Sequence, residues 1–421
     1  MRSALCTIAV TCALASAPTA ALTIACGKIF DAEQAKLLGP HTIEITDGRI
    51  SALKSGASAG ADVDHRTQVC LPGLIDLHTH ISNLEAGPAS YTEGFRLNPG
   101  DYALRGALNA KRTLRAGFTT IRDLGDVDGA SIAVRDAINQ GIAEGPRIYT
   151  AGKSIATTGG HADASNGRNR SLAGQPGPQD GVINGPEQAY AAVRYRYKEG
   201  ADLIKITATG GVLSYAKNGL NPQFSQEEAN AIVAAAKDYG LAVAAHAHGK
   251  EGMRRAILAG VTSIEHGSYM DPDIYPLMKE HGTWLVPTLL AGDWVGAKAN
   301  EFPPIVAAKA RVIGPLLTAN FKRAYQAGVQ IAFGTDTGVS PHGQNAREFK
   351  LMVDAGMPAA IAIQSATHNA ALVLGLSADI GSLSAGHYAD IVVVNGDPLA
   401  DITELQKPVM TYKAGVAYAP L

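Results

Sequence analysis

The chain lacks an excess of charge of either sign. Its 421 residues include 36 lysines and arginines and 38 aspartates and glutamates, which gives a formal net charge of −2. Proteins that bind nucleic acid or anionic membranes present basic patches, so this balance gives no electrostatic reason to expect either partner. A small, near-neutral substrate fits the composition better.

Charged residues are few, and long hydrophobic runs are missing. Charged residues make up 18% of the chain and hydrophobic residues 46%, and there are 46 glycines. This composition argues against disorder and is typical of a tightly packed α/β enzyme with many strand-to-helix turns. No segment reaches the roughly 20 apolar residues that a membrane-spanning helix needs. We therefore expect no membrane span.

The first 21 residues have the layout of a secretory signal. Arg2 precedes an apolar stretch that ends in the small-residue pattern Ala15-Ser16-Ala17. We expect residues 1–21 to be a signal peptide and the mature protein to be periplasmic or secreted. The alternative is an uncleaved apolar element at the N-terminus.

Cysteine is scarce, with four residues in the whole chain. Cys6 and Cys12 lie within the expected signal, so Cys26 and Cys70 remain in the mature protein. An oxidising compartment permits these two to pair. Two ordinary buried thiols are the alternative, and the sequence leaves the choice open.

Both ends of the mature chain have the texture of short strands and turns. Residues 22–72 contain strand-like runs and an Asp47-Gly48 pair, which is a strong β-hairpin signal. Residues 378–421 have the same character, whereas residues 358–376 look helical. We predict that 22–72 and 378–421 form one discontinuous β-sandwich module.

Strand-like and helix-like segments alternate between these ends, in residues 73–377. Helical patterns at 102–117, 226–240 and 250–260 each end in glycine just before the next strand. The candidate strands are 74–81, 119–125, 147–152, 203–210, 241–249, 262–268, 284–290 and 329–336. Eight such units predict an α/β fold of the (β/α)8 TIM-barrel type.

Polar residues interrupt these apolar strands at their C-terminal ends, where TIM barrels carry their chemistry. His78 and His80 are two positions apart, so both side chains leave a strand on the same side. The complete set is His78, His80, Lys205, His246, His248, His266 and Asp336. Singly, each has an ordinary structural explanation. Jointly, imidazoles and a carboxylate at one barrel mouth predict a metal site, with zinc as the first expectation.

Lys205 is the unusual member of the set, because it lies within the apolar stretch "DLIKITATGG". Burial disfavours the ammonium form, so we expect a lowered pKa and an available neutral amine. A neutral lysine can take up carbon dioxide and form a carbamate, an anion able to bridge two cations. The competing interpretation is a charged Lys205 paired with a buried carboxylate or a substrate phosphate.

Five ordered motifs carry a resemblance to a known family. The segments "PGLIDLHTH", "IKITATGG", "AHAHG", "IEHG" and "FGTDTG" resemble the amidohydrolase superfamily, and within it the Xaa-Pro dipeptidase-like and imidazolonepropionase-like branch. The resemblance covers nearly the whole chain after residue 21. It implies two divalent metal ions, which carboxylated Lys205 and a hydroxide would bridge.

The resemblance also implies a division of ligands. His78, His80 and Asp336 would hold one ion, and His246 and His266 the other. His248 projects to the same side as His246 and is expected to support the site or contact substrate, although the choice between these two histidines stays open. Asp336 would act as general base and pass a proton to the departing nitrogen.

Three loop residues are further candidates. His161 and Tyr215 could donate a hydrogen bond to a developing oxyanion, and His342 could contact a substrate carboxylate. The alternative for each is a loop residue with local hydrogen bonds only.

The expected reaction is hydrolysis of the amide of an N-acyl amino acid or a dipeptide-like small molecule. The chain also resembles bacterial amidohydrolases that split ochratoxin A into ochratoxin alpha and phenylalanine. Hydrolysis of phosphotriesters or lactones is an alternative because related enzymes use the same ligands, and a mononuclear deaminase is another. The resemblance further implies a homo-oligomer.

Overall fold

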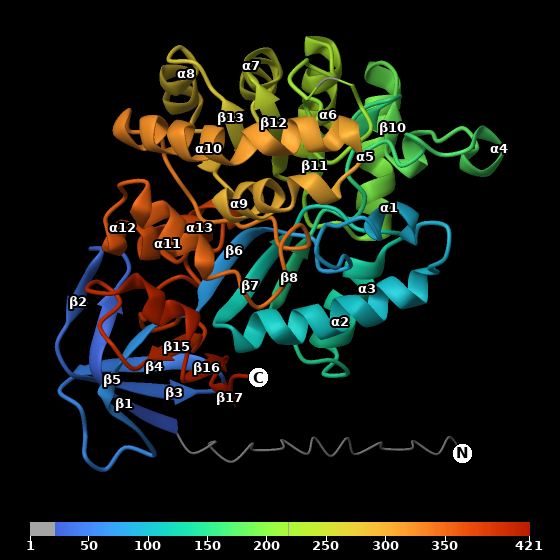
Figure 1. Ribbon diagram of the computed structural model, residues 1–421. Coiled ribbons are helices and arrows are strands. Elements are labelled where there is room, and N and C mark those ends of the chain that lie inside the picture. Colours follow the sequence, from blue (N-terminus) through green and yellow to red (C-terminus); the bar gives the residue numbers. More distant parts are fainter. Residues whose placement is uncertain (1–21, 218) are drawn as a thin grey trace, which may run out of the picture.

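The computed structural model describes residues 22–217 and 219–421 (Figure 1). The expected signal, 1–21, lies outside this range. Strands from both ends of the described chain lie side by side in one sheet, blue and red in Figure 1. Its order is β17-β16-β15-β5-β1-β3-β4, with β2 added to β1. The strands are β1 (Leu22–Asp31), β2 (Lys36–Leu38), β3 (His41–Thr46), β4 (Arg49–Ser55), β5 (Val63–Pro72), β15 (Ile391–Val394), β16 (Met410–Lys413) and β17 (Val416–Tyr418).

This terminal sheet confirms the expected pairing of the two ends of the chain. β15 runs antiparallel to β5, with Val393 opposite Cys70. The Asp47-Gly48 hairpin joins β3 to β4, and both residues have positive φ, +50° and +75°, as a type I′ turn requires. All eight strands belong to a single sheet, so the two-layered sandwich remains a prediction.

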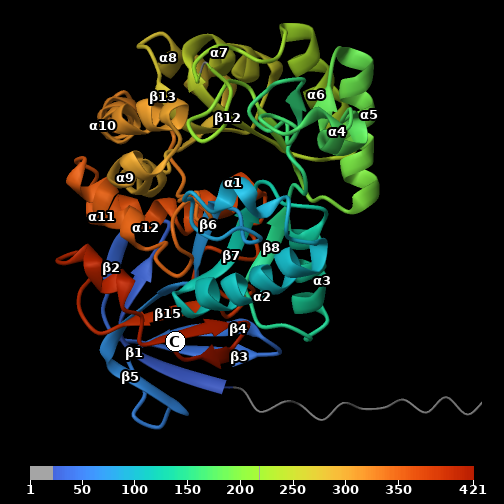
Figure 2. The same cartoon turned by 45° about the vertical axis from the view of Figure 1, so that its right-hand side comes forward.

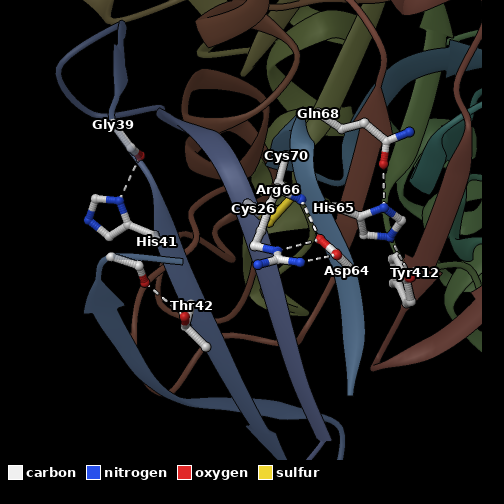
Figure 3. The surroundings of a disulfide bond; sticks show 11 residues. Cys26, Gly39, His41, Thr42, Asp64, His65, Arg66, Gln68, Cys70 and Tyr412 are labelled. Atoms are coloured by element: carbon white, nitrogen blue, oxygen red, sulfur yellow. Dashed lines mark hydrogen bonds and ion pairs between the residues drawn. A yellow bond between two sulfur atoms is a disulfide. The ribbon is translucent and has the colours of Figure 1, made fainter. Parts of the chain in front are cut away.

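A disulfide between Cys26 and Cys70 joins β1 to β5 (Figure 3). The two residues are 44 positions apart, and both are fully buried. An apolar cluster surrounds them, and it includes Ile24, Ile43, Ile50, Ile391 and Val393. Of the two alternatives that the sequence left open, the structure contains the disulfide.

The central strands are parallel and form two groups. One group is β6 (Leu74–Thr79), β7 (Phe118–Asp123) and β8 (Arg147–Thr150), and the other is β11 (Ile204–Thr207), β12 (Val243–Gly249), β13 (Ser263–Tyr269) and β14 (Trp284–Val286). A short pair, β9 (Ala156–Thr157) and β10 (Val182–Ile183), lies beside them. Ile155 links the groups by donating its N–H to the carbonyl of Lys205. The result is a TIM-barrel-like α/β fold.

Two predicted strands differ in the structure. The strand expected at 284–290 ends at Val286, because Pro287 has no N–H to donate and Thr288 takes a left-handed φ of +53°. Residues 329–336 do not form a regular strand. Their backbone is nevertheless tied to β6, where Leu77 donates to Phe333 and Asp336 donates to His78.

Helices follow the strands and cover them on the outside (Figures 1 and 2). They are α1 (Ser90–Glu93), α2 (Pro99–Arg115), α3 (Ala130–Asn139), α4 (Arg170–Ala173), α5 (Pro186–Glu199), α6 (Gln226–Asp238), α7 (Lys250–Ala259), α8 (Ile274–His281), α9 (Leu289–Ala297), α10 (Pro304–Gln326), α11 (Arg347–Asp354), α12 (Ala359–Ser365) and α13 (His368–Leu374). Short 3-10 turns occupy Pro178–Asp180, Ala299–Glu301 and Ile402–Gln406.

The helices predicted from sequence periodicity are confirmed by α2, α6 and α7, and the helical segment 358–376 contains the two helices α12 and α13. A capping box explains where α6 begins, since Ser225 and Glu228 satisfy each other's backbone N–H groups. Among the residues that the structure describes, no helix is long and apolar enough to cross a membrane.

Candidate metal centre

Two candidate ligands lie on β6. His78 and His80 both line one pocket, as their spacing predicts. His80 donates Nδ1–H to the carbonyl of Gly125 at 2.8 Å, and Nδ1 of His78 lies 2.9 Å from a carboxylate oxygen of Glu265. Because a carbonyl and a carboxylate only accept hydrogen bonds, Nδ1 carries the proton in both rings. The lone pair of each Nε2 is therefore available to a metal.

A buried ion pair between Arg122 and Glu265 holds the side chain of His78. Arg122 on β7 donates to Glu265 at 2.8 Å and to the carbonyl of Leu77 at 2.6 Å. Both charged side chains are essentially inaccessible to solvent. Burial alone would raise the pKa of Glu265, but Arg122 and His78 outweigh it and lower this pKa to about 2. Glu265 stays ionised and fixes the orientation of the His78 ring.

β12 and β13 supply further imidazoles. On β12, Nδ1 of His248 lies 2.7 Å from the hydroxyl of Ser268, and on β13, Nδ1 of His266 lies 2.7 Å from the hydroxyl of Thr288. Each ring is thus anchored through one nitrogen, and its Nε2 is left for a ligand. The structure confirms that both strands deliver histidines to the pocket.

His246 is oriented the other way round. Its Nε2–H donates to the carbonyl of Gly210 at 3.1 Å, so its Nδ1 is the nitrogen with a free lone pair. His246, His248 and His266 can each offer one ligand atom within 4.8 Å of the other two. The described geometry admits both His246 and His248 as ligands.

A second group consists of His78, His266 and Asp336, whose ligand atoms also lie within 4.8 Å of one another. His266 belongs to both groups, so the two possible ion positions are adjacent. Asp336 Oδ1 lies 3.2 Å from Nε2 of His80 and 3.5 Å from Nε2 of His78. The residues predicted to hold metal are therefore brought together.

The backbone at the site is held in unusual conformations. His266 and Asp336 have φ values of +71° and +59°, a left-handed region that costs non-glycine residues energy and is concentrated at functional sites. Asp76 helps to hold the second of these, because its buried carboxylate accepts a hydrogen bond from the Thr335 hydroxyl at 2.6 Å. It also accepts the N–H of Thr335 at 3.1 Å, and these two bonds tie β6 to the Asp336 segment.

Lys205 extends from β11 into the same pocket and is 3% exposed. Its Nζ lies 3.4 Å from Nε2 of His78. Burial lowers the pKa of Lys205 to about 8, as the sequence predicted. An amine with this pKa is neutral in about one molecule in ten at pH 7, far more often than an exposed lysine.

Four of the imidazoles of the site are neutral at neutral pH. Burial lowers the pKa of His78 and His248 to about 4 and that of His246 and His266 well below the usual value. Burial would also lower the pKa of His80, but the neighbouring carboxylate of Asp336 outweighs it and raises this pKa. Metal ions bind the neutral form of imidazole. The burial of these rings thus keeps the donor set ready for metal.

Apolar residues form the rest of the pocket wall. They come from the loop after β11, from α9 and α10, and from the segment after Asp336. The lining residues are Val212, Leu213, Ala291, Gly292, Val295, Ile313, Leu317 and Val339. The wall requires the two helices to approach closely, since a Cβ on Gly292 would lie 2.6 Å from a methyl carbon of Leu317.

The three loop candidates occupy different places. His161 lines the pocket and stacks on His246, with ring centroids 4.4 Å apart. Tyr215 is 41% exposed and is not one of the residues that line this pocket. His342 is buried outside the pocket lining and donates Nε2–H to the carbonyl of His80 at 3.2 Å. This placement favours a supporting role for His342.

Sequence reasoning missed the groups that anchor the ligands, above all Arg122, Glu265, Thr288 and Ser268. One signal was available for Glu265, since it precedes His266 inside an otherwise apolar strand and needs a buried partner. No local pattern identifies Arg122 as that partner, because it lies 143 positions away in the chain.

Known proteins with similar sequences and structures place the chain in a family. Residues 69–417 match the model of the amidohydrolase family. An ochratoxinase of Aspergillus niger is 35% identical over 363 residues, which cover 82% of this chain and 74% of that protein. An imidazolonepropionase of Xanthomonas axonopodis pv. citri is 28% identical over 79% of this chain and 80% of its own length.

Solved structures agree with the sequence relatives. A Xaa-Pro dipeptidase with methionine bound in its active site has a TM-score of 0.92 and 47% identity, covering 95% of this chain and all of that one. The crystal structure of A. niger ochratoxinase has a TM-score of 0.83 and 32% identity, with 95% of both chains covered. The chain belongs to the amidohydrolase family and is a hydrolase that acts on amide bonds.

Proposed function

We propose that the protein is a binuclear metal-dependent amidohydrolase that cleaves N-acyl amino acids or dipeptide-like amides with an apolar acyl group. The observation that carries this proposal is that imidazoles, Lys205 and Asp336 line the same pocket as a set of apolar residues. Family membership supports the reaction class.

The donor set fits two divalent ions. His78, His80 and Asp336 would hold one, and His266 with His246 or His248 would hold the other. Lys205, as a carbamate, would supply the bridging anion, which also removes a cation from a cluster of imidazoles. The nitrogen and oxygen donors favour zinc, while manganese and cobalt suit the same ligands. Bound there, the ions would polarise the scissile carbonyl and lower the pKa of the attacking water.

Asp336 is the proposed general base. Burial would raise its pKa, but His78 and His80 lower it below the usual value and keep the carboxylate ionised at neutral pH. It would take the proton of the attacking water and deliver it to the departing nitrogen. His161 lines the pocket and has a buried Nδ1 without a hydrogen-bond partner, and it would donate to the developing oxyanion.

The substrate proposal rests on the apolar wall. Leu213, Val295, Ile313 and Leu317 would surround an apolar group attached to the scissile amide. The names of the relatives are consistent with this class, because one is an ochratoxinase and another binds methionine in its active site. Within this class, ochratoxin A, cleaved to ochratoxin alpha and phenylalanine, is the specific substrate that we propose to test first.

A substrate panel tests the proposal. Purified protein is incubated with ochratoxin A, N-acyl amino acids and Xaa-Pro dipeptides, and the release of free amino acid is measured beside a phosphotriester and a lactone. We expect amide cleavage that is faster for apolar than for polar acyl groups. Turnover of the phosphotriester or lactone without any amide cleavage would contradict the proposal.

Metal analysis separates the proposal from a mononuclear deaminase. Two ions per active chain agree with the binuclear site, whereas one ion together with ammonia release favours the deaminase. Lys205→Met is the matched variant, because it keeps the length of the side chain and removes the amine. We expect this variant to lose an ion and nearly all amide hydrolysis.

We also propose that the protein acts outside the cytoplasm, in the periplasm or after secretion. The Cys26–Cys70 disulfide supports this, because such bonds persist in oxidising compartments. A homo-oligomer is proposed from the family resemblance. Fractionation of expressing cells and light scattering of the purified protein test these two proposals.

A further inference from the structure

α9 begins with an unusual cap. Thr288 occupies the position before Leu289, where a threonine hydroxyl ordinarily accepts a hydrogen bond from the first turn of the helix. Here Thr288 has a φ of +53° and makes no such bond. Its hydroxyl lies instead 2.7 Å from Nδ1 of His266. The residue suited to cap the helix is therefore used to orient a candidate metal ligand.

Glu348, from α11, takes the place of Thr288 as the cap of α9 by accepting hydrogen bonds from the first backbone N–H groups of this helix. One carboxylate oxygen accepts the N–H of Leu289 at 2.8 Å, and the other accepts the N–H of Leu290 at 2.6 Å. Glu348 is fully buried, and burial raises its pKa to about 8. Burying a carboxyl group is costly even when it is protonated, and Glu348 is buried here where two helix N–H groups would otherwise be unsatisfied.

The position of α9 affects both sides of the pocket. α9 packs between α10 and α11 (Figures 1 and 2). Ala291, Gly292 and Val295 on this helix form part of the apolar wall, and Thr288 at its beginning holds His266. A shift of the first turn of α9 would therefore move the wall and the ligand together.

We propose that Glu348 is a positioning residue for the metal centre: by capping α9 in place of Thr288, it frees the Thr288 hydroxyl to orient His266. This inference rests on the proposed function, in which His266 binds metal. Glu348 itself contacts neither the substrate nor an ion. Its effect passes through Thr288.

Variants at Thr288 distinguish orientation of His266 from helix stability. Thr288→Gly removes the hydroxyl and relieves a left-handed conformation that is unfavourable for a β-branched residue, which offsets part of the cost of losing a buried side chain. We expect at least a tenfold weaker affinity for one of the two ions, measured by chelator competition. Thr288→Ser keeps the hydroxyl and should bind both ions nearly as the wild type does.

Variants at Glu348 test the link to the helix. Glu348→Gln keeps one acceptor oxygen and loses the other, and we expect weaker binding of the same single ion. Glu404→Gln is the matched control, because Glu404 also accepts a backbone N–H, that of Gly396, but in the C-terminal segment. The control should bind both ions with wild-type affinity.

The outcomes separate the two proposals. Wild-type affinity for both ions in Glu348→Gln and Thr288→Gly would overturn the positioning role, and so would equal loss in Glu404→Gln. If the wild-type protein itself bound no metal, the proposed function would fail first and this inference with it. If the double variant Thr288→Gly/Glu348→Gln weakens metal binding no more than Thr288→Gly alone, both residues act through the orientation of His266.

Discussion

The apolar cluster of the terminal sheet and the candidate metal ligands of the pocket are both buried, but they are built in opposite ways. In the sheet, an apolar cluster surrounds the Cys26–Cys70 disulfide, and strand pairing satisfies the backbone. At the mouth, histidines and carboxylates are buried together, and His266 and Asp336 adopt left-handed backbone conformations. The sheet gains stability from apolar burial and paired strands. The pocket instead buries polar groups and strained backbone, both of which cost free energy of folding. Such costly features are expected where a protein carries out chemistry.

The largest expected effect is at the mouth. Asp336→Asn removes the proposed base, and asparagine tolerates the left-handed φ at this position, so the backbone is preserved. We expect kcat/KM for amide hydrolysis to fall about 1,000-fold or more, with little change in thermal unfolding. Steady-state kinetics and circular dichroism measure the two quantities. Activity within tenfold of the wild type would remove Asp336 from the mechanism.

The second effect concerns the buried ion pair behind His78. Arg122→Met leaves Glu265 buried without its cation, and we expect the free energy of unfolding to fall by about 3–5 kcal/mol. Adding Glu265→Gln removes the uncompensated charge and should restore part of this loss. Denaturant titration of the single and double variants gives the comparison. A double variant less stable than Arg122→Met would show that the uncompensated charge of Glu265 is not the main cause of the lost stability.

The third effect tests the sheet. Replacing Cys26 and Cys70 together by alanine should lower the free energy of unfolding by about 2–4 kcal/mol, because a closed loop of the unfolded chain is released. The proposed catalytic residues lie outside this sheet, so kcat should stay unchanged. Urea unfolding and substrate turnover are measured on the same preparation. Loss of turnover in the folded variant would mean that the two regions are coupled.

The smallest effect is a dependence of stability on pH in the metal-free protein. Burial lowers the pKa of His161 to about 3 and that of His248 to about 4, whereas both are near 6.5 when unfolded. The unfolded chain therefore binds protons first, and stability is complete above pH 6.5 and decreases as the pH falls towards 3–4. Between pH 7 and pH 6 we expect about 0.7 kcal/mol lost per histidine. Buried carboxyl groups such as Glu348, whose pKa is raised to about 8, act in the opposite direction, so urea midpoints at the two pH values are compared between the wild type and His161→Gln. The same pH dependence in both proteins would contradict the prediction.

Local patterns predicted the parts of the molecule that depend on local physics. The Asp47-Gly48 hairpin and the helices α6 and α7 follow from turn chemistry, capping and periodicity. Side chains alternate along a strand, which predicts that His78 and His80 face the same pocket and that His246 and His248 do so as well. These features need no knowledge of distant contacts.

The remaining parts depend on partners that are far apart in sequence. Arg122 and Glu265 meet only in the folded protein, and so do Glu348 and the first turn of α9. The early end of β14 has a local cause in Pro287, but the left-handed conformation of Thr288 accompanies its contact with His266. Periodicity and motif spacing carry no information on such pairs.

The central claim is that a pair of divalent ions at the pocket mouth is required for amide hydrolysis. The direct measurement removes metal with a chelator, titrates zinc back, and follows bound zinc and amide cleavage in the same samples. The account predicts no turnover without metal and full recovery near two ions per chain. Undiminished cleavage by protein shown to be free of metal would contradict it.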